Sequence, residues 1–357
     1  MSEAVDVEPA ARDERVPATP ETLRTSIRLN NDTPVSTFVE LAVAAERAGF
    51  DQLWVSHDLL LRSAPVLLAA AAGATRSIRL GTGVLNCYSA HPVELAMHAA
   101  TLQELSGGRA LLGIAAGSAE FLAKAGIDQR APLTRTSEAV RACRALLDGG
   151  SPGAIAGAGS WGADARLGEP PATRVPIYLG AMSPKMLALA GALADGALAL
   201  LYPPEHFPVA AAQVADGARA AGRDLACVDV PACVWVSVDD DPERAAAPLA
   251  DKLAFYGTAF APYLLERAGL TPADFAPAAD ALAAGDHPRA RSLVTRDMLR
   301  LGIAGTPEEV VERCAGLIDA GATHVSFGPP LGPDPVAAVT LLGERVVPAL
   351  RARASER

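Results

Sequence analysis

Short apolar runs alternate with longer stretches in which apolar residues recur every three or four positions, and this pattern continues along most of the chain. The short runs are typical of buried parallel strands, and the longer stretches are typical of helices with one apolar face. Eight strands are predicted in this way. They are 26–29, 52–55, 78–82, 110–114, 176–179, 196–200, 228–238 and 324–327.

Helical segments follow the predicted strands. The expected helices are 37–48, 65–75, 92–105, 136–147, one from about 183, 207–221, 241–256, 306–320 and 336–352. The helix start at Thr306 is the clearest, because Thr306 and Glu309 suit a capping box and Pro307 suits the first helical position. Residues 257–297 interrupt the pattern and are rich in Ala, Pro and Asp, so we predict an insertion there.

Repeated alternation of strand and helix predicts a parallel α/β fold, and eight strands are the number that a closed (β/α)8 TIM barrel needs. An open, doubly wound sheet is the alternative, and the absence of a GxGxxG motif after the first strand disfavours it. We expect one barrel domain over residues 25–352, with the insertion at 257–297 near its mouth, where it is suited to act as a lid. The acidic segment 1–24 is expected to be a disordered extension, or else to cover a partner's surface.

Composition narrows the possible partners. Half of the residues are hydrophobic, only 4% are aromatic, and the formal net charge is −10. No Lys/Arg-rich block suits a nucleic acid, and no run suits a membrane span or a signal-peptide core, so we expect a cytoplasmic protein. The five cysteines form no CxxC pair and no zinc spacing, so we expect reduced thiols and no metal site.

Active sites of such barrels lie at the C-terminal ends of the strands, which makes the residues at and after the end of each predicted strand the candidates. The candidates are Arg28, Asn30, Asn31 and Asp32; Ser56, His57, Asp58 and Arg62; Gly83, Val84 and Asn86; Gly117, Ser118 and Glu120; and Gly180, Ala181, Met182 and Ser183. His57 is the best acid–base candidate, because imidazole titrates near neutral pH, and Asp58 is a candidate to orient it. A structural histidine is the alternative.

The segment 180–183 stands before Pro184 at an expected helix start. Free N–H groups and the helix dipole attract anions at such a position, which predicts a phosphate site. An ordinary helix cap at Ser183 is the alternative.

Six stretches together resemble the bacterial luciferase-like superfamily, and most closely its F420-dependent methylenetetrahydromethanopterin reductases. The resemblance covers roughly residues 25–350. The stretches are Glu46–Trp54, Ile78–Val84, Thr101–Ile114, Pro176–Ala181, Ala190–Ala197 and Gly328–Asp334.

This resemblance implies a deazaflavin cofactor, coenzyme F420, with FMN as the alternative. It implies that residues 180–183 hold the cofactor phosphate. It also implies that Gly83 and Val84 form a non-prolyl cis peptide behind the cofactor ring, with a plain turn as the alternative reading of this glycine. Asn86, Gly117 and Ser118 are assigned to the same cofactor site. The family further implies a homodimer, with the helices near the second and third strands at the interface.

The sequence departs from the reductases on the substrate side of the site. Where they carry Glu after the first strand, this chain has Arg28; their Asp-His is His57-Asp58, and their Gly-Asp is Gly117-Ser118. Arginine is permanently protonated and cannot act as a proton-donating acid. Arg28 is therefore a candidate to hold a substrate carboxylate or phosphate, or else it pairs with Asp58 or Asp32. Glu120 is a candidate to replace the carboxylate lost at position 118.

These features favour an F420H2-dependent oxidoreductase that transfers a hydride to a C=C or C=N bond of a small molecule or peptide. A role in specialised metabolism is expected, with a substrate other than methylenetetrahydromethanopterin. Two alternatives stay open: an FMN-dependent monooxygenase of the same superfamily, and a non-catalytic barrel that only binds a flavin or deazaflavin. Cys87 stands on the loop near the expected ring position, and a small core residue is its default reading.

Overall fold

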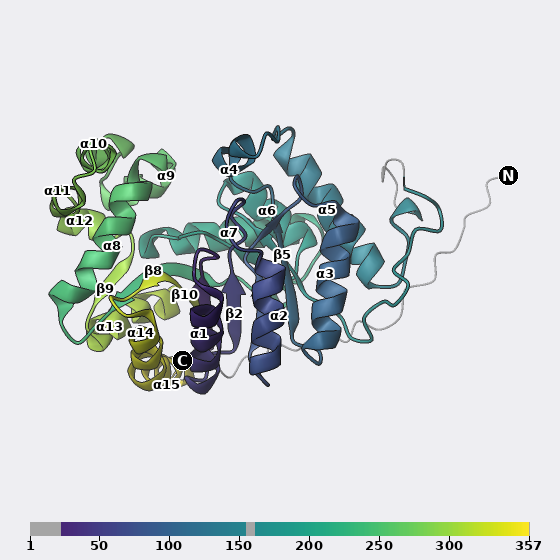
Figure 1. The fold of residues 1–357 in the computed structure, drawn as a ribbon, viewed down its shortest axis with the longest axis horizontal. Helices are drawn as coiled ribbons and strands as arrows, with labels where there is room; N and C mark the ends of the chain where they lie inside the picture. Colours follow the sequence, from purple (N-terminus) through teal and green to yellow (C-terminus); the bar gives the residue numbers. More distant parts are fainter. Residues whose placement is uncertain (1–22, 155–160, 357) are drawn as a thin grey trace.

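The computed structural model describes residues 23–154 and 161–356. Within them, parallel strands form one curled sheet that helices surround (Figure 1). The strands are β1 (Arg24–Leu29), β2 (Gln52–Val55), β3 (Arg79–Thr82), β4 (Leu85–Asn86), β5 (Ala110–Ala115), β6 (Ile177–Gly180), β7 (Gly196–Leu198), β8 (Ala232–Val238), β9 (Ile303–Gly305) and β10 (His324–Leu331).

The sheet follows the order β7-β6-β5-β3-β2-β1-β10-β8-β9, with β4 paired to β5. The seam between β7 and β8 is closed by a parallel bridge between Gly196 and Asp229 and by the hydrogen bond from the amide of Tyr202 to the carbonyl of Cys233, 2.7 Å. Eight strands close the barrel when β3 and β4 are counted as one interrupted strand and β9, which pairs only with the outer edge of β8, is left out. The predicted (β/α)8 barrel is therefore confirmed.

Two strand predictions needed correction. The expected strand 228–238 begins at Ala232, and Asp229 supplies only the closing bridge. The strand β9 was missed, because its three residues between Gly302 and Gly305 are too short for a periodic signal. It pairs with the outer edge of β8 and extends the sheet beyond the barrel.

The helices pack around the strands. They are α1 (Val35–Arg47), α2 (Ala64–Ala74), α3 (Pro92–Leu105), α5 (Pro132–Leu147), α6 (Pro184–Leu193), α7 (Phe207–Ala220), α8 (Pro242–Tyr256), α13 (Pro307–Asp319), α14 (Pro335–Leu341) and α15 (Val347–Ser355). The capping box predicted at the start of α13 is present, with Thr306 accepting from the amide of Glu309. A π-helical turn, Leu342–Val346, joins α14 and α15 within the expected last helix. Among the described residues, none of the helices has the length and apolar character to cross a membrane.

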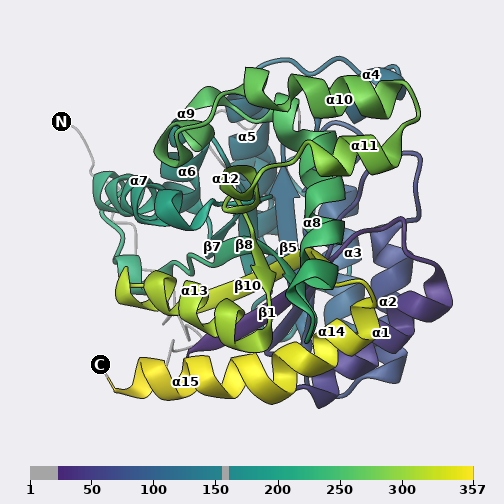
Figure 2. The same ribbon diagram turned by 90° about the vertical axis from the view of Figure 1, so that its left-hand side faces the viewer.

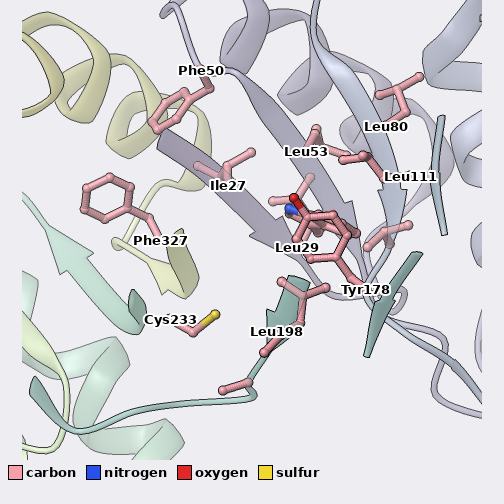
Figure 3. Close-up of a cluster of buried hydrophobic side chains, with 14 of the residues drawn as sticks. Ile27, Leu29, Phe50, Leu53, Leu80, Leu111, Tyr178, Leu198, Cys233 and Phe327 are labelled. Atoms are coloured by element: carbon pink, nitrogen blue, oxygen red, sulfur yellow. The ribbon is translucent and has the colours of Figure 1, made fainter. Parts of the chain in front are cut away.

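Aliphatic side chains in register hold the sheet to its helices. Ile27, Leu53 and Leu80 are neighbours on consecutive strands, and Figure 3 shows them in one buried cluster. Phe50 and Phe327 meet edge to face beside it, with ring centroids 6.1 Å apart. Branched side chains in such layers explain why few aromatic residues suffice for this core.

Trp54 fills the inside of the barrel. It is fully buried, and its ring lies 4.7 Å from that of Tyr178. A Cβ atom on Gly81 would overlap the Trp54 ring, so the strand needs glycine there. Gly81 is therefore a packing position inside β3.

The insertion lies at the C-terminal ends of the barrel strands. Its elements are η4 (Gly257–Ala259), α9 (Pro262–Leu265), η5 (Glu266–Ala268), η6 (Pro272–Phe275), α10 (Ala276–Ala283), α11 (His287–Ser292) and α12 (Arg296–Leu299). Figure 2 shows α9 and α10 at the same end of the molecule as α4 (Ala119–Lys124), opposite α15. Phe260, Leu265 and Phe275 form a separate small core with Trp235 of β8. The expectation for residues 1–22 lies outside the described part, and Leu23 is already buried, so the boundary expected after residue 24 falls inside β1.

Candidate active site

Arg28 spans the barrel interior near the C-terminal ends of the strands. Its Nη1 donates to the carbonyls of Ala199 and Leu200, at 2.8 and 2.7 Å, and its Nη2 donates to those of Val234 and Ser326, at 2.8 and 3.4 Å. Burial lowers the pKa of this guanidinium. Within the described ranges only Nε lacks a partner. The four carbonyl contacts make Arg28 a tie between β1 and the strands opposite it.

This arrangement corrects both readings of Arg28. A two-pronged contact with a substrate anion needs N–H groups that here are already given to main-chain carbonyls. The alternative ion pair with Asp58 or Asp32 is also not formed among the described residues. A Cβ on Gly328 would overlap Nη2 of Arg28, so the neighbouring strand leaves room for the guanidinium.

The loop after β2 carries His57 and Asp58. Nδ1 of His57 accepts a hydrogen bond of 3.1 Å from the amide of Ala64 at the start of α2, and burial lowers its pKa. Burial raises the pKa of Asp58, and the Ser56 hydroxyl, 3.3 Å from its Oδ2, partly offsets this. No hydrogen bond joins His57 and Asp58 in the described part of the chain, so the expected orienting contact is not present.

Asn31 holds this loop in place. It is fully buried, and its side-chain amide donates to the carbonyls of Asp58 and Arg62, at 3.0 and 2.6 Å. Its Oδ1 accepts from the Ser56 hydroxyl, 3.0 Å, and from the Asp58 amide, 3.2 Å. An asparagine after a strand was noted in the sequence, but only the fold shows that it fixes Asp58.

The expected cofactor residues from three strands lie side by side. The Gly83–Val84 peptide bond is cis, as the resemblance implies. A Cβ on Gly180 would lie 3.2 Å from the Val84 methyl groups, and one on Gly117 would lie 2.8 Å from Cβ of Asn86. Asn86 is buried, and its Oδ1 accepts from the amides of Tyr88 and Ser89. These residues therefore form one continuous wall of the mouth.

Two carbonyls of the loop between β6 and α6 accept hydrogen bonds from tyrosine hydroxyls. The carbonyls of Ala181 and Met182 accept from the hydroxyls of Tyr202 and Tyr263, at 3.3 and 3.1 Å. Ser183 stands at the N-cap of α6 without a side-chain cap bond. Among the described residues, the amides of Met182, Ser183 and Lys185 find no acceptor. Free N–H groups at a helix start can bind an anion, so this geometry is compatible with the predicted phosphate site, which stays a prediction.

Glu120 and Cys87 play smaller parts. Glu120 lies on the exposed helix α4 and pairs with Lys124 at 2.6 Å, while Ser118 caps that helix without a side-chain bond. Glu120 is nevertheless close enough to Tyr256 to help raise the pKa of its hydroxyl. Cys87 is buried, and burial raises the pKa of its thiol, which fits a core residue. No group of three potential metal ligands occurs in the described residues.

Sequence reasoning missed the side of the mouth formed by β8 and α8. Nζ of Lys252 lies 4.5 Å from the centre of the Trp235 ring system and 5.4 Å from that of Tyr256. Burial, and then the charge of Arg28, lower the pKa of Lys252 to about 8, although Asp32 and Asp58 oppose the shift. Periodicity places Lys252 on a helix, but it does not reveal which strand end that helix covers.

Buried polar atoms without a partner gather at this end of the barrel. They include Nε of Arg28, both ring nitrogens of His206, Nε1 of Trp235 and Oγ of Ser237. Unpaired buried polar groups are rare in proteins and call for an explanation such as a ligand or ordered water. A closed parallel barrel with such groups and with free amides at its C-terminal mouth is the architecture of an α/β-barrel enzyme, and the free amides are suited to a phosphorylated ligand.

Comparisons with known proteins agree with this class. The luciferase-like monooxygenase family matches residues 18–324. A 5,10-methylenetetrahydromethanopterin reductase of Methanolobus tindarius is 36% identical over 319 residues, which cover 88% of this chain and 96% of the relative. An F420-dependent glucose-6-phosphate dehydrogenase of Nakamurella multipartita is 31% identical, covering 89% of this chain and 93% of the relative.

The solved structure of the coenzyme F420 dependent tetrahydromethanopterin reductase from Methanopyrus kandleri superposes with a TM-score of 0.82 at 31% identity, covering 92% of this chain and 99% of that one. The chain therefore belongs to the luciferase-like family, within its F420-dependent oxidoreductases. The predicted fold, family and cofactor class are confirmed at this level.

Proposed function

We propose that this protein binds coenzyme F420 at the barrel mouth and transfers a hydride to a C=C or C=N bond of a small molecule or peptide. The observation that carries the proposal is the wall formed by Val84, Asn86, Gly117 and Gly180, which ends at the free amides of Met182 and Ser183. The Methanopyrus kandleri reductase and the Nakamurella multipartita dehydrogenase act on different substrates, as their names state, and both names give F420 as the cofactor.

The residues present fit this cofactor. The amides of Met182 and Ser183 would hold its phosphate. Gly180 packs closely against Val84, which brings the cis peptide next to the loop that carries these amides. Bound F420 supplies a hydride donor or acceptor that works in two-electron steps. The chain's own task is to fix the phosphate, flank the ring and keep the substrate carbon close to it.

On the substrate side, the residues differ from what a methylenetetrahydromethanopterin reductase needs. Arg28 is committed to four carbonyls and has no proton to give. Asp58 is half-buried, and burial raises the pKa of its carboxyl group. We infer a substrate other than methylenetetrahydromethanopterin, in keeping with a role in specialised metabolism.

A binding titration tests the cofactor. Purified protein is titrated with F420 and, separately, with FMN, and the dissociation constants are compared from the change in cofactor fluorescence. We expect F420 to bind at least tenfold more tightly than FMN. Preference for FMN would favour the monooxygenase alternative. Tight F420 binding without turnover of any C=C or C=N compound would favour the non-catalytic barrel.

We further propose a homodimer formed through α2 and α3. These helices expose the large apolar side chains of Val66, Met97 and Leu105, with exposed fractions of 64%, 47% and 53%. Sedimentation of the double variant Val66→Glu/Met97→Glu tests this, with Leu225→Glu, another exposed apolar position, as the control. We expect only the double variant to sediment as a monomer, and an unchanged mass would exclude this surface.

The buried cysteines support an intracellular setting. The buried cysteines Cys87, Cys143, Cys233 and Cys314 form no disulfide, and reduced thiols are typical of a reducing compartment. We therefore propose that the protein works in the cytoplasm, and fractionation of the producing cell checks it.

A further inference from the structure

Lysine is rare in this chain. Of its 31 basic residues only three are lysines, Lys124, Lys185 and Lys252, and all the others are arginines. Each of the three follows a barrel strand on the side of the mouth: Lys124 in α4, Lys185 in the first turn of α6 and Lys252 in α8. Arginine stays protonated at any working pH, whereas lysine can release its proton when it is partly buried. A partly buried lysine in this chain can therefore exchange a proton where an arginine cannot.

Lys252 has no partner for its charged end. Nζ lies over the rings of Trp235 and Tyr256, and it forms no hydrogen bond or ion pair among the described residues. By contrast, Lys124 is paired with Glu120 at 2.6 Å. The aromatic rings orient the Lys252 ammonium without taking any of its protons, so all three N–H groups remain available.

The charged groups around Lys252 come from several elements. Arg28 of β1 repels its positive charge, whereas Asp32 and Asp58, from the loops after β1 and β2, attract it. The Tyr256 hydroxyl comes from α8 itself. Its pKa is raised by burial and by the charges of Asp58, Asp32 and Glu120. On the outer side of α8, Arg291 of α11 is occupied by Asp251 at 2.6 Å and does not compete. Lys252 thus belongs to the same group of charges as Asp58, on the side of the mouth where the substrate is proposed to lie.

We infer that Lys252 exchanges the proton with the substrate during the reaction, and this inference rests on the proposed function. When the carbon of a C=N bond, or the far carbon of an enone, accepts a hydride with its electron pair, the π electrons move to the nitrogen or oxygen. That atom takes one proton from the Lys252 ammonium, which becomes a neutral amine. Water returns the proton, so each bond reduced consumes one hydride and one proton.

Other side chains at the mouth are less suited to this step. Nδ1 of His57 already accepts from the amide of Ala64, which leaves only its other nitrogen. Arg28 cannot release a proton. The negative charge of the Asp58 carboxylate raises the pKa of Lys252 and so favours the protonated amine. Asp58 is therefore a positioning residue that keeps Lys252 charged before the hydride arrives.

The first test needs no cofactor and no substrate. The full chain is labelled with trace acetic anhydride between pH 6 and 11, and peptide mass spectrometry follows each lysine separately. We expect Lys252 to reach half of its maximal rate near pH 8, below the pH at which Lys124 does so. We expect Asp58→Asn to move that midpoint lower still, and Asp128→Asn, at an exposed pair with Arg130, to leave it unchanged. A Lys252 that labels in parallel with Lys124 would overturn the inference.

The second test uses turnover with reduced F420 and two probes, cyclohexenone and pyrroline. We expect kcat/KM of the wild type to fall above about pH 8 and Lys252→Gln to lower kcat by roughly 100-fold or more. Lys252→Arg keeps the positive charge and should leave the structure of the mouth intact. In this variant kcat/KM should no longer fall above about pH 8, because arginine stays protonated. The dissociation constant for F420 should not change in either variant.

The two proposals fail in different ways. If F420 does not bind, or neither probe is reduced by the wild type, the proposed function fails in this form, and the labelling still decides whether Lys252 is a titrating, accessible amine. If the probes are reduced and both Lys252 variants keep the rate and the pH profile of the wild type, the inference about Lys252 is wrong and the proposed function stands.

Discussion

Nδ1 of His324 lies 2.9 Å from Oδ2 of Asp229, and Nε2 of the same ring lies 2.9 Å from Oγ of Ser26. The order serine, histidine and aspartate is that of a hydrolase triad. Here His324 and Ser26 are fully buried at the end of the barrel opposite the mouth, and the Ser26 hydroxyl also donates to that of Ser326 at 2.7 Å. The arrangement therefore ties β1 and β10 to Asp229, the residue that closes the barrel before β8, at the end where barrel active sites do not lie.

Asp229 should be essential for stability. Its Oδ2 also accepts from the Tyr178 hydroxyl, 2.7 Å, and pairs with Arg24, 2.8 Å. Asp229→Asn leaves buried donors and a positive charge without their partner, and we expect a loss of about 3–5 kcal/mol in the free energy of unfolding. Urea denaturation measures it. Asp240→Asn, at an exposed pair with Arg345, is the control and should change stability by less than about 1 kcal/mol.

The same carboxyl group sets an acid limit on stability. Burial alone would raise the pKa of Asp229, but His324 and Arg24 hold it well below the ordinary value of 3.8. As the pH falls, the unfolded chain therefore protonates this carboxyl group before the folded chain does. The stabilisation by Asp229 is complete above the ordinary pKa of 3.8 and is lost as the pH falls towards the lower pKa of the folded chain. The acid limb of a plot of Tm against pH should flatten in Asp229→Asn.

Gly81 should not tolerate a side chain. Its Cβ would overlap the Trp54 ring, which is enclosed by the barrel. We expect Gly81→Ala to cost about 1–3 kcal/mol, because a packed core resists an extra methyl group. Gly316 of α13 has open space around it, and Gly316→Ala should stabilise by about 0.5–1 kcal/mol through helix propensity. Equal effects of the two changes in thermal denaturation would contradict this account of Gly81.

The sequence was a good guide to the scaffold because periodicity and helix caps are local signals. Thr306 and Glu309 form the predicted capping box, and Ile27, Leu53 and Leu80 lie on predicted strands. The role of Arg28 could not be read in the same way. Its partners Ala199 and Val234 are about 170 and 200 residues distant, and no local pattern encodes a contact between a side chain and carbonyls of such remote strands.

The residues of the candidate site differ in the same way, because some can be found from local sequence and others only from the folded chain. Gly83 and Gly180 stand directly after or within short strands, so the rule for barrel mouths finds them. Lys252 is 14 residues beyond the end of β8 on a helix whose direction depends on the insertion. The contacts of Phe260 and Phe275 with Trp235 fix that direction, and such packing becomes visible only in the folded chain.

The amide of Ser183 should matter more for cofactor binding than its hydroxyl. Ser183 has φ −80°, which suits proline, and its side chain makes no cap bond. Ser183→Pro removes one free N–H group at the start of α6, so we expect the dissociation constant for F420 to rise about tenfold or more, since a hydrogen bond to a charged group is worth about 1.5–3 kcal/mol. Ser183→Ala keeps the N–H group and should change affinity less than threefold. A larger loss in Ser183→Ala than in Ser183→Pro would assign the phosphate contact to the hydroxyl.

Lys252 should lower the stability of the protein at neutral pH. Its pKa of about 8 in the folded chain is below the ordinary value of 10.5, because burial and Arg28 outweigh Asp32 and Asp58. Between these two values the unfolded chain binds more protons, so this side chain makes stability rise with pH there, and its penalty is complete below about pH 8.

Replacing Lys252 with methionine should remove that penalty. We expect Lys252→Met to be more stable than the wild type by on the order of 1 kcal/mol at pH 7, or about 2 °C in Tm, because a neutral side chain packs on Trp235 without desolvating a charge. The difference should shrink steadily as the pH is raised towards 10.5, where lysine is neutral in both states. Lys124→Met, at an exposed pair with Glu120, should show neither the gain nor the pH dependence. A Lys252→Met variant that is less stable than the wild type at pH 7 would mean that the contacts of the ammonium with Trp235 and Tyr256 outweigh its burial.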